Sequence, residues 1–195
     1  RVGYRVVGDE DLRKLAGSDG REGVVADVLG EEPLDLDTWL AGLRGGSALA
    51  IWLDGVGNPH NLGAILRSAA HFGVAGLLLP AGSQLALSGA AARVAEGGAE
   101  AVPLVHLPRT AVADERLHEA GFVLAATLVH GGADLFSTPL PKRLVYVMGA
   151  EGEGMDRGFA DACDLRLSIP GSGAVESLNV ASATAVLLAK WVSGS

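Results

Sequence analysis

Short runs that are apolar on both faces alternate with helical patterns over most of the chain. Four runs have the length and character of strands covered on both sides, at Ala48–Leu53, Ala75–Leu79, Phe122–Leu128 and Leu144–Met148. Three stretches have helical spacing, at Asn61–His71, Gly89–Ala95 and Thr110–Glu119, with Thr110 expected as an N-cap. This alternation predicts an α/β fold with a mostly parallel sheet flanked by helices.

The N-terminal part departs from this pattern. It contains a short predicted strand, an acidic helix opened by Asp9 or Asp11 and a second predicted strand, the two strands being Tyr4–Val7 and Gly23–Leu29. Residues 31–46 are acidic, with one short helix predicted around Leu36–Leu43. We therefore predict three parts: residues 1–30, which are too few for a domain of their own, a linker at 31–46, and the main domain at 47–195.

The last predicted helix, roughly Ser177–Val192, is apolar nearly all the way round. Such a helix is buried on more than one side, either inside the domain or against a second subunit. Its most apolar side chains are Val186, Leu187, Leu188 and Trp191. Because they present more surface than one domain needs to cover, we expect a homodimer that buries this helix.

Composition narrows the possible functions. The net charge of −8 argues against an indiscriminate nucleic-acid coat, although it leaves room for a local basic site. No uncharged apolar run reaches the roughly 18 residues of a membrane span, so we expect no membrane partner. The five histidines and the single Cys163 show no ligand spacing, so no metal is expected. Without a signal-peptide pattern, the expected location is cytoplasmic.

Three segments combine glycine, polar side chains and a strand end. The first, residues 57–67, places Asn61 as an expected N-cap and Arg67 on the helix that follows. An arginine there can bind a phosphate or carboxylate with two parallel hydrogen bonds. The alternative is that Asn61 only caps the helix and Arg67 only forms a surface ion pair.

The other two segments follow later strands. Residues 148–155 alternate three glycines with Glu151 and Glu153, a pattern that resembles a dinucleotide loop only weakly, because Glu153 would repel a pyrophosphate. Residues 167–179 form a glycine loop after a short strand, with Ser177 opening the last helix and Asn179 in its first turn. Taken alone, this loop is also explained by simple capping. Since ligands bind beyond the carboxyl ends of parallel strands, we expect all three segments to meet at one sheet edge.

In this order, the segments resemble the three motifs of the SpoU (TrmH-type) RNA 2′-O-ribose methyltransferases of the SPOUT class. The resemblance covers about residues 48–192, and its motifs are Asn61-x-Gly63-x-x-x-Arg67, Met148-Gly149-x-Glu151-Gly152-x-Gly154 and Ile169-Pro170-x-x-Gly173-x-x-x-Ser177-Leu178-Asn179. Residues 95–100 are also similar to a subgroup of tRNA/rRNA methyltransferases, whose usual threonine is Val94 here.

The resemblance implies a C-terminal trefoil knot, S-adenosylmethionine as cofactor, a tRNA or rRNA substrate methylated on a ribose 2′-hydroxyl, and a homodimer whose site draws on both subunits. It also implies that residues 1–30 are the remnant of an N-terminal substrate-binding domain. The implied catalytic residues are Arg67, Asn61, Glu151, Ser177 and Asn179. The implied cofactor-binding residues are Gly149, Ile169, Gly173 and Leu178.

Two other hypotheses remain. A noncatalytic, knotted RNA-binding module is favoured by the acidic net charge and the incomplete N-terminal domain. A nucleotide-dependent oxidoreductase would bind NAD(P) and have no affinity for S-adenosylhomocysteine.

Overall fold

The computed structural model describes residues 3–16, 23–26, 32–83, 85–149 and 155–194. The chain divides into two compact units, residues 1–32 and 33–195. The first unit contains α1 (Asp9–Ala16), which begins with three acidic residues and buries none of its side chains.

The strand predicted at Tyr4–Val7 is wrong. These residues form no strand, and Tyr4 is 90% exposed, since no neighbouring strand among the described residues pairs with them. The described part of the second predicted strand, residues 23–26, is not a strand either, and residues 27–29 of that prediction lie outside the described part of the chain.

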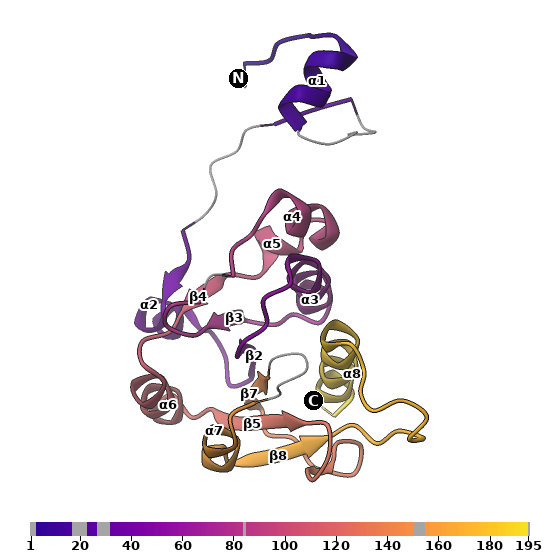
Figure 1. Ribbon diagram of the computed structural model, residues 1–195. Helices are drawn as coiled ribbons and strands as arrows, with labels where there is room; N and C mark the ends of the chain where they lie inside the picture. The colour runs from indigo at the N-terminus through magenta and orange to yellow at the C-terminus, as the bar shows by residue number, and fades with distance from the viewer. Residues whose placement is uncertain (1–2, 17–22, 27–31, 84, 150–154, 195) are drawn as a thin grey trace. The chain divides into compact units, whose positions relative to one another are not determined.

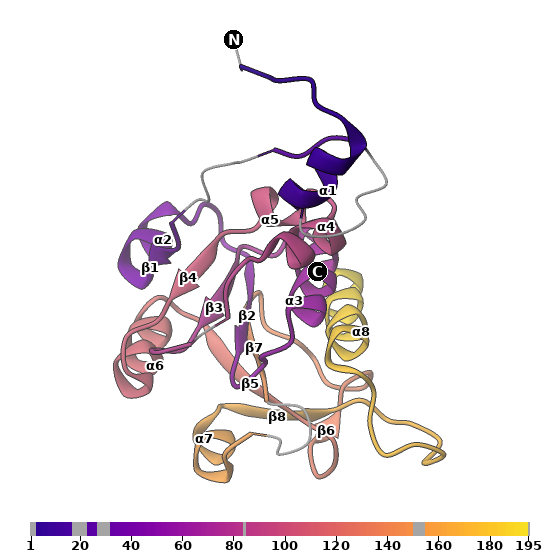
Figure 2. The same cartoon turned by 45° about the horizontal axis from the view of Figure 1, so that its top comes forward.

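The second unit is a single parallel sheet with helices on both faces, as the sequence predicts (Figure 1). Its strands are β1 (Leu34–Asp35), β2 (Ala48–Leu53), β3 (Gly76–Leu79), β4 (Leu104–His106), β5 (Val123–Leu128), β6 (Ala133–Asp134), β7 (Arg143–Met148) and β8 (Leu165–Ser168). Their order in the sheet is β1-β4-β3-β2-β7-β5-β8-β6, which places β1 and β6 at opposite ends (Figure 2).

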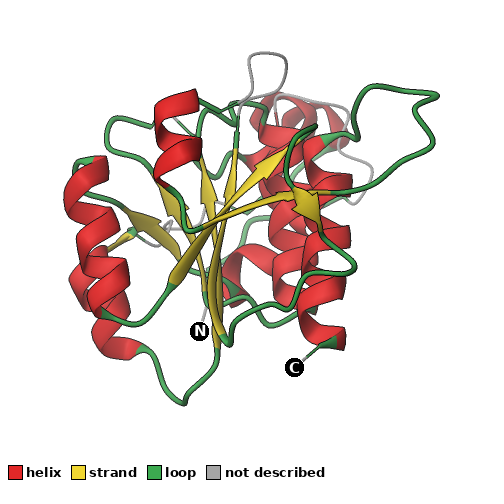
Figure 3. Cartoon of the chain, turned by 90° about the horizontal axis from the view of Figure 1, so that it is seen from below, coloured by secondary structure: helices red, strands yellow, loops and turns green. Residues whose placement is uncertain are grey.

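The helices are α2 (Leu36–Gly42), α3 (Pro59–His71), α4 (Gly89–Ala95), α5 (Gly98–Ala101), α6 (Thr110–Glu119), α7 (Arg157–Ala162) and α8 (Val180–Ser193). These helices form two layers, one on each face of the sheet, and alternating side chains of β2 pack against one layer or the other. Leu49, Ile51 and Leu53 share one buried cluster with residues of α3, α4 and α8, whereas Ala50 and Trp52 share another with α2, α6 and α7. Helices therefore cover both sheet faces (Figure 3), which explains why the central strands are apolar throughout.

Residues 33–46, predicted to lie in a linker, belong to the larger unit. Within them, β1 pairs with β4, and Trp39 of α2 is only 3% exposed. The indole N–H of Trp39 donates to the backbone carbonyl of Ala75 at 2.8 Å. A Cβ at Gly76 would lie 2.6 Å from the indole nitrogen, so this glycine makes room for the tryptophan. Among the described residues, no helix combines the length and apolar character needed to cross a membrane.

Candidate active site at the carboxyl edge of the sheet

The three segments selected from the sequence all leave the sheet at the same edge. β2, β7, β5 and β8 are successive parallel neighbours, and Leu53 pairs in register with Met148. Met148 in turn pairs with Thr127, and the next residue, Leu128, pairs with Ser168. The chain therefore leaves β2, β7 and β8 at the same edge, with β5 between β7 and β8, and ligands of parallel α/β sheets bind at this edge.

Asn61 and Asn179 join the first and third segments directly. The amide nitrogen Nδ2 of Asn179 donates to Oδ1 of Asn61 at 3.1 Å, and Asn61 is only 9% exposed. The two residues are 118 positions apart in the chain, so this bond fixes the start of α3 against the start of α8. The structure therefore brings together two of the five predicted catalytic residues.

The residues that cap α3, α6 and α8 differ from those expected from the sequence. Asn58, not Asn61, caps α3: its Oδ1 accepts from the N–H of His60 at 2.9 Å, and Pro59 takes the first helical position, where its missing N–H does no harm. Asn179, not Ser177, caps α8, accepting from the N–H groups of Ala181 and Ser182. The expected cap at Thr110 is also wrong, because α6 is preceded by Arg109 without a side-chain cap.

The loop before α8 carries most of the predicted cofactor residues. Ser177 and Leu178 precede the helix instead of opening it, and Leu178 is 48% exposed. Gly173 has a φ of +80°, a conformation that favours glycine. Ile169 is half-buried against the core at the start of the loop. Gly149 directly follows β7, and Glu151 lies outside the described residues.

The side chain of Arg67 does not join Asn61 and Asn179 at the carboxyl edge. It lies eight residues after Pro59, or about 12 Å along the axis of α3 away from the carboxyl edge. It follows Asn61 by six positions, which turns its side chain by about 120° around the helix relative to that of Asn61. Its guanidinium Nη1 lies 3.0 Å from Oε1 of Glu96, and the two side chains are 59% and 62% exposed. Within one chain, Arg67 thus forms the surface ion pair of the alternative interpretation and does not join the two asparagines.

The loop after β5 also lies at this edge, and the sequence analysis missed it. The N–H of Gly132 donates to Oγ of Ser168 at 3.0 Å, and a Cβ at Gly132 would lie 2.5 Å from the backbone carbonyl carbon of Leu167. Only glycine allows this approach. The signal was the pair Gly131-Gly132 just after an apolar run, which is typical of a close backbone contact.

Asp54 and Asp156 place two carboxylates near each other at this edge. Asp54 directly follows β2, and its N–H donates to the carbonyl of Met148 at 2.8 Å. Burial raises the pKa of Asp54, and the nearby charge of Asp156 raises it further. A cationic ligand would relieve this repulsion, whereas a pyrophosphate would increase it. Among the described residues, no group of three or more His, Cys, Asp or Glu is placed to hold a metal ion.

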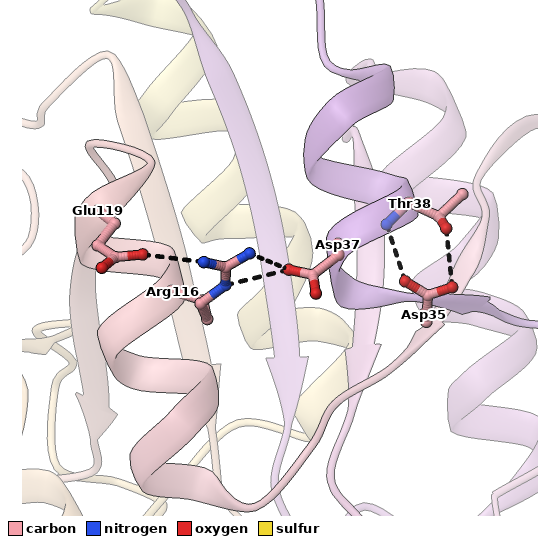
Figure 4. A network of polar contacts seen from close by, with 5 residues as sticks. All are labelled: Asp35, Asp37, Thr38, Arg116 and Glu119. Atoms are coloured by element: carbon pink, nitrogen blue, oxygen red, sulfur yellow. Dashed lines mark hydrogen bonds and ion pairs between the residues drawn. The ribbon is translucent and has the colours of Figure 1, made fainter.

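A hollow of about 380 Å³ lies at the other end of the sheet, between α2, α6 and the ends of β1 and β4. Its charged groups satisfy one another (Figure 4): Nη2 of Arg116 lies 2.6 Å from Oδ1 of Asp37, and its Nη1 lies 3.2 Å from Oε2 of Glu119. Asp35 accepts from both the N–H and the hydroxyl of Thr38. This network fastens α2 to α6, and we assign it a structural role.

Comparisons with known proteins agree with the motifs. The model of the SpoU rRNA Methylase family matches residues 48–189. The chain is 37% identical over 191 residues to the uncharacterized tRNA/rRNA methyltransferase YfiF of Escherichia coli O157:H7, covering 98% of this chain and 55% of YfiF. It is 39% identical over 181 residues to the 23S rRNA (guanosine-2'-O-)-methyltransferase RlmB of Ralstonia nicotianae, covering 92% of this chain and 72% of RlmB.

The fold is similar to that of the SpoU methyltransferase AviRb from Streptomyces viridochromogenes, solved in complex with the cofactor AdoMet. The TM-score is 0.75 at 26% identity, covering 83% of this chain and 65% of AviRb. The chain thus spans less than two thirds of the length of YfiF and of AviRb.

Proposed function

The chain belongs to the SpoU rRNA methylase family, and from this we propose that it transfers a methyl group from S-adenosylmethionine to a ribose 2′-hydroxyl of a structured RNA, rRNA or tRNA. The observation that carries the proposal is the Asn61–Asn179 bond, which joins two of the family's three motifs at the carboxyl edge of the sheet. RlmB acts on 23S rRNA by name and YfiF is named for tRNA and rRNA, so we propose these two substrate classes.

The residues at the edge fit S-adenosylmethionine, whose sulfonium supplies the methyl group. A Cβ at Gly171 or Gly173 would meet no atom within 4 Å, so the loop after β8 leaves its backbone open to a ligand. The carboxylates of Asp54 and Asp156 favour a positive charge nearby. We propose that backbone groups at Gly149, Ile169, Gly173 and Leu178 hold the adenosyl part, with Glu151 and Ser177 shaping the site.

A ribose hydroxyl is a weak nucleophile at neutral pH, so it must be held in line and its developing negative charge stabilised. When bound, S-adenosylmethionine would supply the methyl group to the 2′-oxygen and leave as S-adenosylhomocysteine, and the hydroxyl proton would pass to water. The guanidinium of Arg67 stays protonated at neutral pH and is a poor base. We therefore assign Arg67 to the RNA, binding a phosphate and stabilising the oxygen as its proton leaves.

The position of Arg67 supports a homodimer with a composite site. Because Arg67 lies about 12 Å along α3 from Pro59 and pairs with Glu96 on its own chain, we propose that it serves the cofactor loop of a second subunit. Apolar side chains exposed in the loops at this edge provide a surface for a second copy: Val129 is 49%, Val175 72% and Leu178 48% exposed. The argument from α8 itself is partly wrong, since Leu187 and Leu188 are covered by their own core.

Three finer points stay predictions. These are the trefoil knot, the origin of residues 1–30 as a remnant of a substrate-binding domain, and a cytoplasmic location, where rRNA and tRNA are processed.

The test combines binding and activity. S-adenosylmethionine is titrated calorimetrically, and transfer of a labelled methyl group to unmodified rRNA and tRNA is measured. We expect Arg67→Ala to abolish transfer while cofactor affinity stays within a few-fold, because the cofactor rests on the second and third segments. Arg109→Ala, which removes an exposed arginine from the opposite sheet face, is the matched control.

Loss of cofactor binding in Arg67→Ala would contradict the assignment of this residue to the RNA. RNA binding by the parent without any methyl transfer would favour the noncatalytic module, and NAD(P) binding without affinity for S-adenosylhomocysteine would favour an oxidoreductase.

A further inference from the structure

Arg67, the residue assigned to the RNA, is held by one carboxylate. Nη1 of Arg67 lies 3.0 Å from Oε1 of Glu96, which ends α4 as its C-cap. An arginine has five N–H donors, so this contact leaves others for a phosphate or a hydroxyl. Both side chains are more than half exposed, and pairs of this kind contribute little to stability. The ion pair therefore adds little to the stability of the fold.

The backbone conformation of Glu96 also indicates a functional role for this residue. Glu96 has φ 45° and ψ 53°, and it is the only residue other than glycine with a positive φ in the described part of the chain. This left-handed conformation is strained for a residue with a long side chain, and glycine would adopt it freely. Strain of this kind concentrates at functional sites.

The turn that carries Glu96 is fixed against α3 by backbone contact. Gly97 follows with φ 87°, and a Cβ at Gly98 would lie 2.7 Å from the carbonyl oxygen of Leu66 and 3.0 Å from Cα of Arg67. Any side chain at Gly98 would push the turn away from Arg67. The turn therefore brings the Glu96 carboxylate to the arginine whether or not the ion pair forms.

We propose that Glu96 is a positioning residue for Arg67, a carboxylate that fixes the direction of the guanidinium before RNA binds. The proposal rests on the proposed function of Arg67. A free arginine side chain samples many rotamers, and a pre-oriented one loses less entropy on binding its target. A small error in the placement of such a group lowers the rate of a reaction strongly.

The first test is Glu96→Gln, with Glu115→Gln as the charge-matched control on the exposed face of α6. We expect Glu96→Gln to lower kcat about tenfold, with unchanged affinity for S-adenosylmethionine. Removing a negative charge beside an RNA site should by itself tighten RNA binding and lower KM. If Glu96 had no positioning role, Glu96→Gln would thus lower KM and leave kcat unchanged, and that result would overturn the proposal.

A second variant separates positioning from folding. Glu96→Gly relieves the left-handed strain, so its midpoint of thermal unfolding should not fall, while kcat should fall at least as far as in Glu96→Gln. If Glu96 had a merely structural role, Glu96→Gly would lower both the midpoint of thermal unfolding and kcat. An unfolding midpoint below that of the parent would count against the strain at Glu96, and an unchanged kcat would overturn its positioning role.

A third measurement does not depend on activity. The Nε–Hε signal of Arg67 in an NMR spectrum of the parent, assigned by its loss in Arg67→Lys, should report a more ordered side chain than in Glu96→Gln. If the parent transfers no methyl group, or if Arg67→Ala keeps full activity, the proposed function fails, and this comparison still decides whether Glu96 orders Arg67. Equal order in both proteins would overturn the proposal.

Discussion

His118 of α6 contacts Asp164, the residue before β8, which in turn binds the backbone of β5. Its Nε2 lies 2.9 Å from Oδ2 of Asp164, and its Nδ1 lies 2.9 Å from the carbonyl oxygen of Asp114. Oδ2 of Asp164 also accepts the N–H of Leu124, the second residue of β5. The hydrogen bond to Asp164 is the main cause that raises the pKa of His118, and the charges of Asp164 and Asp114 add to it.

This contact predicts a pH dependence of stability. Because the folded pKa of His118 lies above its unfolded value of about 6.5, the contact stabilises fully below that pH and loses its effect as pH rises through the folded pKa. The change should be small, since the side chain is 37% exposed. Urea unfolding at several pH values between about 6 and 8 would measure it. In His118→Gln, the free energy of unfolding should lose this fall with pH, and an identical slope in both proteins would contradict the assignment.

At the same scale, Gly173 tests whether the loop between β8 and α8 is the proposed cofactor loop. With φ at +80°, Gly173→Val must strain or move the backbone, at about 1–3 kcal/mol. We expect the affinity for S-adenosylmethionine to fall at least about tenfold, which corresponds to about 1.4 kcal/mol. The dimer should survive, since α8 begins seven residues later at Val180. Calorimetric titration measures the affinity, and parental affinity in the variant would mean that this loop does not line the pocket.

Among the elements, α3 is the one that organises the site, because α4, α5 and α8 all pack against it. Gly63 allows α4 to approach closely. A Cβ at this position would lie 2.5 Å from the carbonyl oxygen of Ala91 and 2.7 Å from Cβ of Val94. The glycine in the first motif thus has a packing role of its own beside any contact with a ligand.

Gly63→Ala should therefore destabilise the protein by about 1–3 kcal/mol, as overpacking does in other cores. Gly89→Ala is the matched control, because a Cβ there meets no atom within 4 Å and alanine is the better helix residue. Its free energy of unfolding should not fall. Equal stability of Gly63→Ala and the parent in denaturant unfolding would show that α3 and α4 can move apart without loss.

How well the elements could be predicted from sequence depended on their burial. β2 runs from Ala48 to Leu53 as predicted, because a strand covered on both faces is an unbroken apolar run. The two-residue strands β1 and β6 carry no such run, and their pairing partners are distant in sequence. Tyr4–Val7 has the composition of a strand but pairs with no strand in the part of the chain that the structure describes, so local pattern alone misled the prediction.

The sequence predicted only some of the contacts among the candidate site residues. Motif order placed Asn61 and Asn179 in one site, and they do contact each other. Arg67 was expected beside them, yet the start of α3 at Pro59 and a spacing of six residues turn it to another face. Its contact with Glu96 depends on a left-handed backbone at a glutamate, which no sequence pattern predicts.

At the scale of the whole molecule, the separation of Arg67 from the cofactor loop is the property that matters most. In a twofold dimer, each site would combine Arg67 of one subunit with the loop after β8 of the other, and both sites would be equivalent. A monomer at micromolar concentration in analytical ultracentrifugation would contradict this arrangement outright. A dimer alone would still leave open which subunit supplies each group, so the test must mix subunits.

Mixing two defective variants provides that test, with S-adenosylmethionine kept well below the dissociation constant of Gly173→Val so that each variant alone transfers little methyl. Arg67→Ala subunits keep an intact cofactor loop, and Gly173→Val subunits keep an intact arginine. If the site is composite, each mixed dimer has one complete site and one site with both defects. Random exchange at equal amounts makes half of the dimers mixed, so about a quarter of the parental methyl transfer should return. A dimer that carries both changes in one subunit and none in the other is the control, because there each composite site has one defect and should stay inactive. If the mixture of single variants stayed inactive while this control was half active, each site would lie within one subunit and the composite arrangement would be wrong.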